Sequence, residues 1–231
     1  RLLGIQACIF TEYVPTPENL EYQIWPRALA IAERGLGRTR SYEEFHQWAV
    51  GVADSMRQAG INAFDLRNEY GQRRESLQPV EHLARGAKVI YNNPYNSFYK
   101  AGGDSTLTDG VCGTWNNNDQ RWQGFIRDID LVLDLGQECE VSSVELSFLQ
   151  ILGPEIFLPA EVSVVPMDKA DADGTSVSYT QLMDSTLADV PFVVQPYKID
   201  MEPQAKTRYL HITAKRTPRR GWLFLDEVVV R

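Results

Sequence analysis

The sequence predicts a mainly β protein, in which an antiparallel β-sandwich is preceded by a helical region. From about Lys88 onward apolar and polar residues alternate, as in the run IDLVLDL from Ile129 to Leu135, and this period of two is typical of strands with one buried face. Clusters of Gly, Pro, Asn and Asp separate such runs, which favours an antiparallel sandwich. In the first 60 residues the apolar residues instead recur every three or four positions, which is the period of an amphipathic helix.

Charge and pattern together divide the chain into a helical part (residues 1–70), a linker (71–87) and the sandwich (88–231). Residues 1–87 carry 10 Lys or Arg and 11 Asp or Glu, whereas residues 88–231 carry 13 and 20. The net charge is therefore −1 in the first stretch and −7 in the second, and such a change supports a boundary. About 140 residues are enough to close one core.

The chain is expected to begin with a strand, a loop and a helix. The apolar run from Ala7 to Phe10 suits a buried strand and is too short for a typical helix. Thr16 and Pro17 then form a typical helix start, and a helical stripe follows at Leu20, Ile24, Ala28, Ile31 and Ala32. In a barrel of such units, groups at the carboxyl end of a strand face the active site. Glu12 is therefore the first carboxylate to consider.

Two runs at this end of the chain carry a family resemblance. The first is QACIFTE, from Gln6 to Glu12, and the second comprises Trp25-Pro26-Arg27, Ala30, Ala32, Glu33 and Arg34. In this order and at this separation they resemble the eighth βα unit of glycoside hydrolase family 20, the β-N-acetylhexosaminidases. The resemblance implies that Glu12 accepts hydrogen bonds from hydroxyls of the terminal sugar. It also implies that Phe10, in place of the family's tryptophan, lines the sugar pocket.

The resemblance also indicates which catalytic motif of the family does not occur in this chain. Family 20 cleaves with an Asp-Glu pair in an H-x-G-G-D-E motif, and no such motif occurs in the 231 residues. We therefore expect the C-terminal part of an exo-acting hexosaminidase, inactive alone, in which residues 1–70 are a helical remnant of a (β/α)₈ barrel. Without the rest of that barrel, residues 1–70 are expected to fold poorly because they expose much apolar surface.

A second helix is predicted after the first unit. Ser41 and Glu44 have the spacing of a capping box. Apolar residues follow at helical spacing, and Gly60 is well placed to end the helix; they are Phe45, Trp48, Ala49, Val52 and Met56.

The second part of the chain carries its own series of short motifs. They are LTDG (107–110), Trp115, VLDLG (132–136), Pro159, VSV (162–164), RYLHI (208–212) and DEV (226–228). This series resembles the discoidin or coagulation-factor C-type, galactose-binding-like sandwich, a fold that includes carbohydrate-binding module family 32. The fold implied is a galactose-binding-like jelly roll.

This second resemblance implies a structural calcium ion, with Asp109 and Glu227 as its side-chain ligands. Calcium takes six to eight oxygen ligands, so backbone oxygens would complete the shell. The alternative is that Asp109 caps a turn and Glu227 pairs with an arginine.

A sugar face is the other site that such a sandwich would carry. Exposed aromatic rings stack on pyranoses, and flanking polar groups bind the hydroxyls. Trp122, Trp115 and Arg219 are the candidates, and each has an alternative role. Trp122 could bind sugar or contact the adjoining barrel, Trp115 could pack under the Asp-Gly turn, and Arg219 could lie in a solvated hairpin. Further aromatic candidates are Tyr99, Phe125 and Trp222.

Composition bounds the possible partners. A net charge of −8 argues against nucleic acid, and no run of 18 apolar residues spans a membrane. Cys8, Cys112 and Cys139 lack metal-ligand spacing, although a Cys112–Cys139 bridge is conceivable.

The resemblance implies glycans with terminal N-acetylglucosamine or N-acetylgalactosamine as partners, and a periplasmic, outer-surface or secreted location. Two alternatives stay open, a stand-alone carbohydrate-binding or adhesion module and a sandwich that only buttresses the barrel.

Overall fold

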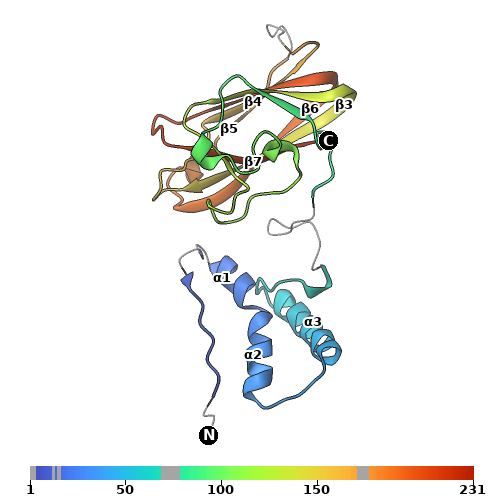
Figure 1. The fold of residues 1–231 in the computed structure, drawn as a ribbon, viewed down its shortest axis with the longest axis vertical. Helices are drawn as coiled ribbons and strands as arrows, with labels where there is room; N and C mark the ends of the chain where they lie inside the picture. The colour runs from blue at the N-terminus through green and yellow to red at the C-terminus, as the bar shows by residue number, and fades with distance from the viewer. Residues whose placement is uncertain (1–3, 12–13, 15–16, 69–78, 171–176) are drawn as a thin grey trace. The chain divides into compact units, whose positions relative to one another are not determined.

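The computed structural model describes residues 4–11, 14, 17–68, 79–170 and 177–231. The chain forms two compact units, Arg1–Gly71 and Gln72–Arg231, drawn in Figure 1. Among the described residues, no helix is both long enough and apolar enough to cross a membrane.

The first unit is helical and has few buried apolar side chains. It contains α1 (Pro17–Ile24), α2 (Arg27–Gly35), α3 (Tyr42–Gln58) and the 3₁₀ turn η2 (Leu66–Asn68). The predicted capping box is present, because the Ser41 side chain accepts a hydrogen bond from the Glu44 amide and the Glu44 carboxylate accepts one from the Ser41 amide. In the described part of this unit the buried apolar residues are Pro26, Leu29, Ala49, Ala53 and Ala63.

The predicted strand at the start of the chain is not buried. Residues 4–10 are exposed, and no strand of the described chain pairs with them. Cys8 lies in this run, for which a buried strand was predicted, and it is exposed as well. An apolar run becomes a buried strand only where neighbouring strands satisfy its amides and carbonyls, and this unit provides none in its described part. All three cysteines are free thiols.

The second unit is the antiparallel sandwich that the sequence predicts. Its strands are β1 (Lys88–Tyr91), β2 (Gln123–Phe125), β3 (Ile129–Ile151), β4 (Glu161–Met167), β5 (Tyr179–Leu182), β6 (Phe192–Lys215) and β7 (Leu223–Val230). Three 3₁₀ turns lie between them, η3 (Ser97–Tyr99), η4 (Thr106–Thr108) and η5 (Ser185–Leu187). Every strand pair is antiparallel, so the predicted fold class is confirmed.

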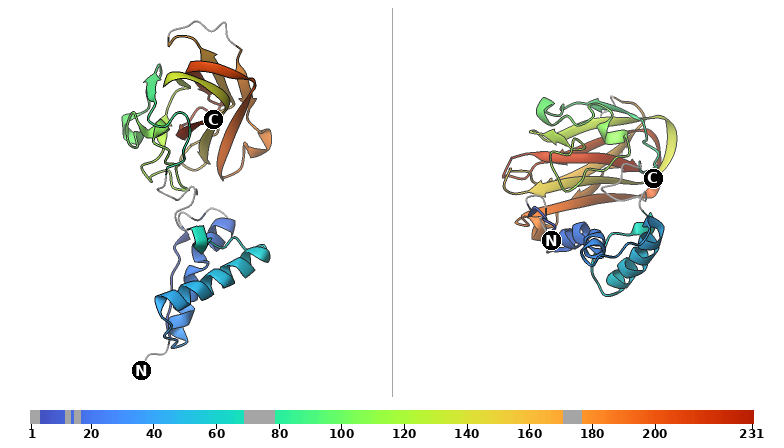
Figure 2. Two further views of the ribbon diagram at one scale, coloured as in Figure 1. Left: turned by 90° about the vertical axis from the view of Figure 1, so that its right-hand side faces the viewer. Right: turned by 60° about the horizontal axis from the view of Figure 1, so that its bottom comes forward.

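The two long strands belong to both layers of the sandwich. β3 and β6 run side by side along their length (Figures 1 and 2) and change register between Asp134 and Cys139 and between Val141 and Ser143. The first half of β3 pairs with β1, and its second half pairs with β7. The second half of β6 pairs with β4. Strand order is therefore β2-β7-β3-β6-β4-β5, with β1 beside β3.

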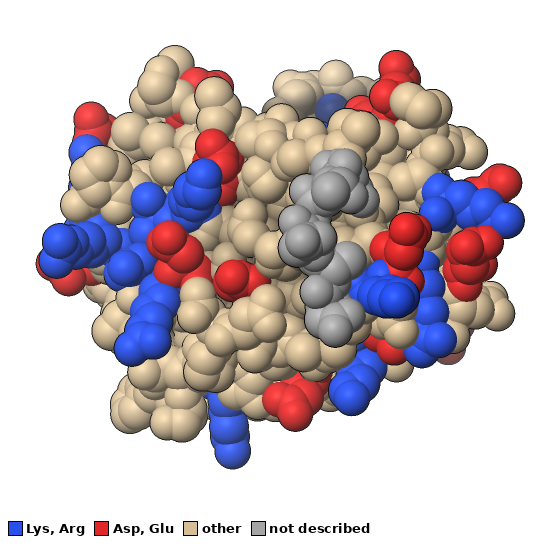
Figure 3. Space-filling view, turned by 90° about the horizontal axis from the view of Figure 1, so that it is seen from above, with Lys and Arg blue, Asp and Glu red and all other residues tan. Residues whose placement is uncertain are grey.

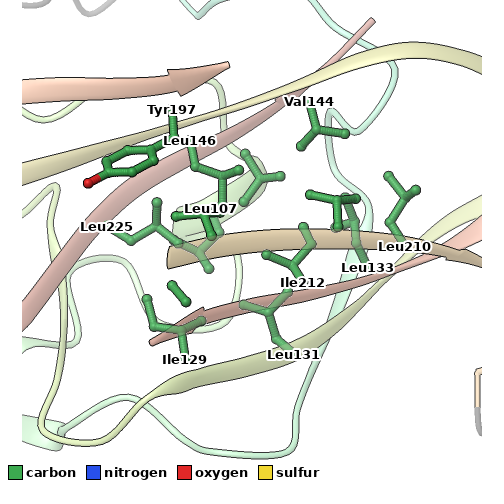
Figure 4. Close-up of a cluster of buried hydrophobic side chains, with 14 of the residues drawn as sticks. Leu107, Ile129, Leu131, Leu133, Val144, Leu146, Tyr197, Leu210, Ile212 and Leu225 are labelled. Atoms are coloured by element: carbon green, nitrogen blue, oxygen red, sulfur yellow. The ribbon is translucent and has the colours of Figure 1, made fainter. Parts of the chain in front are cut away.

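The core lies between these layers and follows the alternation in the sequence. Leu131 pairs with Ile212 and Leu133 with Leu210, and all four side chains are 0% exposed. Leu146, Phe148, Leu223 and Leu225 face them from the other layer, and part of this core is shown in Figure 4.

A second, smaller apolar cluster covers the opposite face of β7. It contains Trp122, Leu149, Ile156 and Phe224, with Tyr99, Ile151, Phe192, Val194 and Trp222 at its margin. Leu223 and Leu225 face the main core while Phe224 between them faces this cluster. The two-sided cover explains why β7 is buried along its whole length.

Residues 79–87, which we call the arm, are bonded to the sandwich although the sequence predicts a linker at 71–87. The amides of Val80, Leu83 and Gly86 donate hydrogen bonds to the carbonyls of Gly110, Val230 and Thr108 at 2.8, 2.9 and 2.8 Å. Ala84 is 0% exposed within the main core. The polar, charged sequence of the arm does not indicate this packing, because backbone amides rather than apolar side chains make the contacts.

Candidate functional site

Of the two predicted sugar contacts of the first unit, Phe10 lies in the extended segment before the first helix. The side chain of Phe10 is 84% exposed, and Glu12 lies outside the described residues. A cavity of about 470 Å³ separates this segment from the first two helices. Among the described residues, the lining of this cavity contains no carboxylic acid and consists of Ala7, Cys8, Ile9, Gln23, Ile24, Arg27, Ala28 and Ile31.

Two charged residues of the second motif hold the helices together. The Arg27 guanidinium donates to the carbonyls of Tyr22 and Gln23 at 2.9 and 3.1 Å and lies 5.3 Å from the centre of the Phe64 ring. Glu33 is only 5% exposed, and its carboxylate accepts a hydrogen bond of 3.3 Å from Arg40. In the described part of the unit, these residues therefore act in packing.

In the sandwich, the two predicted calcium ligands lie at one buried corner beside two residues that we did not predict. We call Asp109, Asp226, Glu227 and His82 the carboxylate corner. Glu227 is 1% exposed, and its Oε2 accepts the Gly110 amide at 2.7 Å. Its Oε1 lies 3.1 Å from His82 Nε2.

The other carboxylates of this corner also accept backbone amides. Asp109 Oδ1 accepts the amide of Val111 at 2.7 Å, and Asp226 Oδ2 accepts that of Gly113 at 2.8 Å. In the described ranges, no three His, Cys, Asp or Glu side chains are grouped so that they could hold a metal ion. The corner thus presents N–H donors where calcium would need oxygen ligands, so the donor set does not match calcium's preference.

Burial dominates the electrostatics of the corner. It raises the pKa of Glu227 to about 9, helped by the negative charges of Asp109 and Asp226 and opposed by the Gly110 amide. It also raises the pKa of Asp109. Burial, then the positive charges of Arg85 and Arg231, lowers the pKa of His82 to about 4. All three shifts favour neutral groups, as expected in a site shielded from water.

His82 could not be found from spacing, since it lies far from residue 227 in the chain. A buried histidine next to a buried acid becomes visible only once the arm is seen to pack on β7.

Trp122 is a core residue and not a sugar platform, which corrects the prediction for it. The ring is 2% exposed, and its Nε1–H donates to the Thr114 carbonyl at 3.1 Å. It lies so close to Gly113 that a β-carbon there would collide with it. The burial also leaves no exposed indole to contact an adjoining barrel. Its polar sequence neighbours misled the interpretation, because the outer face of β7 requires an apolar cover.

Trp115 is half-buried and lies beside Phe192, with ring centres 5.6 Å apart and planes inclined by 34°. Half-buried Trp222 lies 5.1 Å from Tyr99 between ring centres, and both residues border the smaller apolar cluster, as Phe192 does. We call Trp115, Phe192, Trp222 and Tyr99 the aromatic face. Phe192 was not among the aromatic residues considered from the sequence.

Arg219 has different neighbours from Trp115. It forms a 2.5 Å ion pair with Asp189, donates to the Ala188 carbonyl at 2.9 Å, and lies over Phe157. It lines a cavity of about 350 Å³ whose other walls are Gln150, Phe157, Ala160, Met183, Ala188, Thr217 and Pro218.

Acidic and basic side chains are interspersed on the face of the molecule shown in Figure 3. This distribution differs from the single basic stripe typical of a nucleic-acid interface.

Comparison with known proteins gives one family. Residues 1–36 match the model described as "Glycosyl hydrolase family 20, catalytic domain". The match covers both motif runs that resemble this family, and it confirms that resemblance. Comparison with curated proteins gives no match.

Several solved structures are similar to part of the chain at low identity. One is chitosan-binding module 1 from a chitosanase/glucanase of Paenibacillus sp. IK-5, with 12% identity, 66% of this chain and 99% of that chain covered, and a TM-score of 0.45. Another is CpGH89CBM32-4 from Clostridium perfringens, in complex with glcNAc-alpha-1,4-galactose, with 17% identity, 70% and 100% coverage and a TM-score of 0.44. An f-lectin from striped bass serum, Morone saxatilis, has 15% identity, 65% and 48% coverage and a TM-score of 0.48.

Proposed function

We propose that this chain contributes the last strand–helix unit of a β-N-acetylhexosaminidase barrel, followed by an accessory sandwich that binds glycans. The observation that carries the proposal is the match of residues 1–36 to the family 20 catalytic domain. It also separates this proposal from a stand-alone adhesion module, since such a module has no need of a catalytic-domain segment.

In this proposal the whole enzyme releases terminal N-acetylglucosamine or N-acetylgalactosamine outside the cytoplasm, in the periplasm, at the outer surface or after secretion. Glu12 accepts hydrogen bonds from hydroxyls of that sugar, and Phe10 forms an apolar wall. The large exposed fraction of Phe10 supports this role, because the ring is free to pack against a sugar and a neighbouring barrel strand.

Catalysis requires an acid and a group that orients the acetamido substituent, and we propose that both come from the rest of the barrel. The 231-residue chain should therefore release no chromophore from a chromogenic N-acetylglucosaminide. Turnover by the purified chain, abolished by substitution of one of its own carboxylates, would contradict this division of labour.

For the sandwich, we propose that the aromatic face binds the glycan. Half-buried rings present an apolar surface for a pyranose at little entropic cost, because their neighbours already hold them in place. Trp115 is the residue expected to contribute most.

Calorimetric titration of the chain with N-acetylglucosamine, N-acetylgalactosamine and galactose tests this proposal. We expect saturable heat with at least one sugar, lost in Trp115→Ala and retained in Tyr42→Ala. Tyr42 is the control, because it is an aromatic residue that is 69% exposed and lies in α3, outside the sandwich. Unchanged thermal unfolding of both variants would show that they fold.

Absence of heat with every sugar, from a folded protein, would refute the glycan-binding proposal and favour a sandwich that only buttresses the barrel. Equal loss of heat in both variants would move the site away from the aromatic face.

A further inference from the structure

The carboxylate corner joins three segments that are distant in sequence: the arm, the Asp-Gly loop after η4, and β7. Its hydrogen bonds show which groups of the loop are free to bind a cation and which are already used.

The loop carbonyls that face the arm are already used by it. Thr108 O accepts the amide of Gly86, and Gly110 O accepts that of Val80, both at 2.8 Å. Gly110 has a φ of +77°, and a β-carbon there would collide with the Val80 carbonyl and the Arg85 side chain. The arm therefore fits directly against the loop.

The loop amides point at the carboxylates. Glu227, Asp226 and Asp109 accept N–H groups from Gly110, Gly113 and Val111 respectively. N–H donors stabilise carboxyl oxygens and repel a cation, so these three amides do not help to hold a calcium ion.

His82 reaches the remaining oxygen of Glu227. Its side chain is 0% exposed, its Nδ1 accepts the Ala84 amide at 3.3 Å, and its Nε2 lies 3.1 Å from Glu227 Oε1. Neither Nε2 nor Oε1 has a hydrogen-bond partner in the described structure, so the 3.1 Å between them is a close polar contact that does not meet hydrogen-bond geometry. With Nδ1 accepting, Nε2 carries the proton and faces the carboxyl oxygen. The positive charge of Arg85 acts on both Asp109 and Glu227.

We propose that the arm, through His82 and Arg85, closes this corner in place of the calcium ion that the family resemblance implies. Residues 79–87 are then an integral part of the sandwich, and the stability of the sandwich does not depend on calcium.

Thermal unfolding of the full chain in excess calcium and in excess chelator tests the proposal, followed by near-ultraviolet circular dichroism. We expect the same midpoint in both conditions. We expect His82→Leu to lower the midpoint because it replaces the imidazole nitrogen 3.1 Å from Glu227 Oε1 with an apolar side chain, and His82→Gln to recover part of the loss because its amide is polar. Leu83→Gln, at a 45% exposed residue of the same arm, should leave the midpoint unchanged.

A midpoint that rises with calcium in the unsubstituted chain, with the rise lost in Asp109→Asn, would overturn the proposal. So would a His82→Leu midpoint equal to that of the unsubstituted chain. If His82→Leu fails to fold, the calcium comparison on the unsubstituted chain still decides the question.

Discussion

Trp122 shows how much one side chain contributes to the outer face of the sandwich. Its ring covers Phe224, Leu149 and Ile156, and its N–H is satisfied by a backbone carbonyl within its own loop. Trp122→Ala would remove the largest fully buried side chain and leave a cavity, so we expect the free energy of unfolding of the sandwich to fall by about 3–5 kcal/mol.

Denaturant unfolding followed by tryptophan fluorescence measures this loss. Phe98→Ala serves as the control, since truncating an exposed ring should change the free energy of unfolding by no more than about 0.5 kcal/mol. A similar small effect for both variants would mean that the loop closes over the space left by the indole.

Single residues were predicted from sequence with uneven success. Asp109 and Glu227 were predicted to share a site because each belongs to a short family motif, and both do lie at the carboxylate corner. Trp122 was misassigned because its polar neighbours in sequence are not its neighbours in space. His82 and Phe192 were missed, since each acquires its role only when distant strands pack against it. The local pattern therefore predicts secondary structure and the face of a strand on which a residue lies. Long-range strand pairing decides which side chains share a site.

At the scale of elements, α3 offers two serines whose removal should have opposite effects. Ser41 accepts the Glu44 amide at 3.2 Å as the helix cap, so Ser41→Ala should destabilise the helix by about 1 kcal/mol. Ser55 lies inside the helix and bonds back to the Gly51 carbonyl at 3.0 Å, so Ser55→Ala should stabilise it by about 0.5 kcal/mol. Far-ultraviolet circular dichroism during thermal unfolding measures both changes. A Ser41→Ala variant as stable as the unsubstituted chain would contradict the capping role of Ser41.

The capping box also predicts a pH dependence. The hydrogen bond from the Ser41 backbone amide holds the pKa of Glu44 below its ordinary value. The ionised carboxylate therefore stabilises the helix above the ordinary pKa of glutamate, and this contribution is lost as the pH falls through the lowered value.

Helices and strands were predicted best where the apolar pattern repeats over many residues. The alternating runs lie in β3, β4, β6 and β7, and the capping box begins α3 where expected. The short strands β1, β2 and β5 are three or four residues long, which is too short for a period to be read. The run Ala7 to Phe10 has the composition of a strand, but composition cannot supply a partner for its backbone.

At the scale of the whole molecule, the two units differ in how much apolar surface they bury. The sandwich has a large continuous core, whereas Ile5, Ile9, Phe10, Ile31 and Leu36 of the first unit are exposed. We expect amides of α3 to exchange with deuterium well before those of β3 and β6, because opening the first unit disrupts few buried contacts. Hydrogen exchange followed by mass spectrometry measures this difference. Equal protection of α3 and β3 would show that the first unit is as stable as the sandwich.

The position of β7 has a consequence for synthesis on the ribosome. β7 lies between β2 and β3, and Val144 pairs with Val230 near the carboxyl end of the chain. β3 can pair with β6 before β7 emerges, but one edge of its second half then stays open to neighbouring nascent chains. The core can close only after β7 has been translated. We expect the domain to be most prone to aggregation between the pairing of β3 with β6 and the later pairing of β7 with β3.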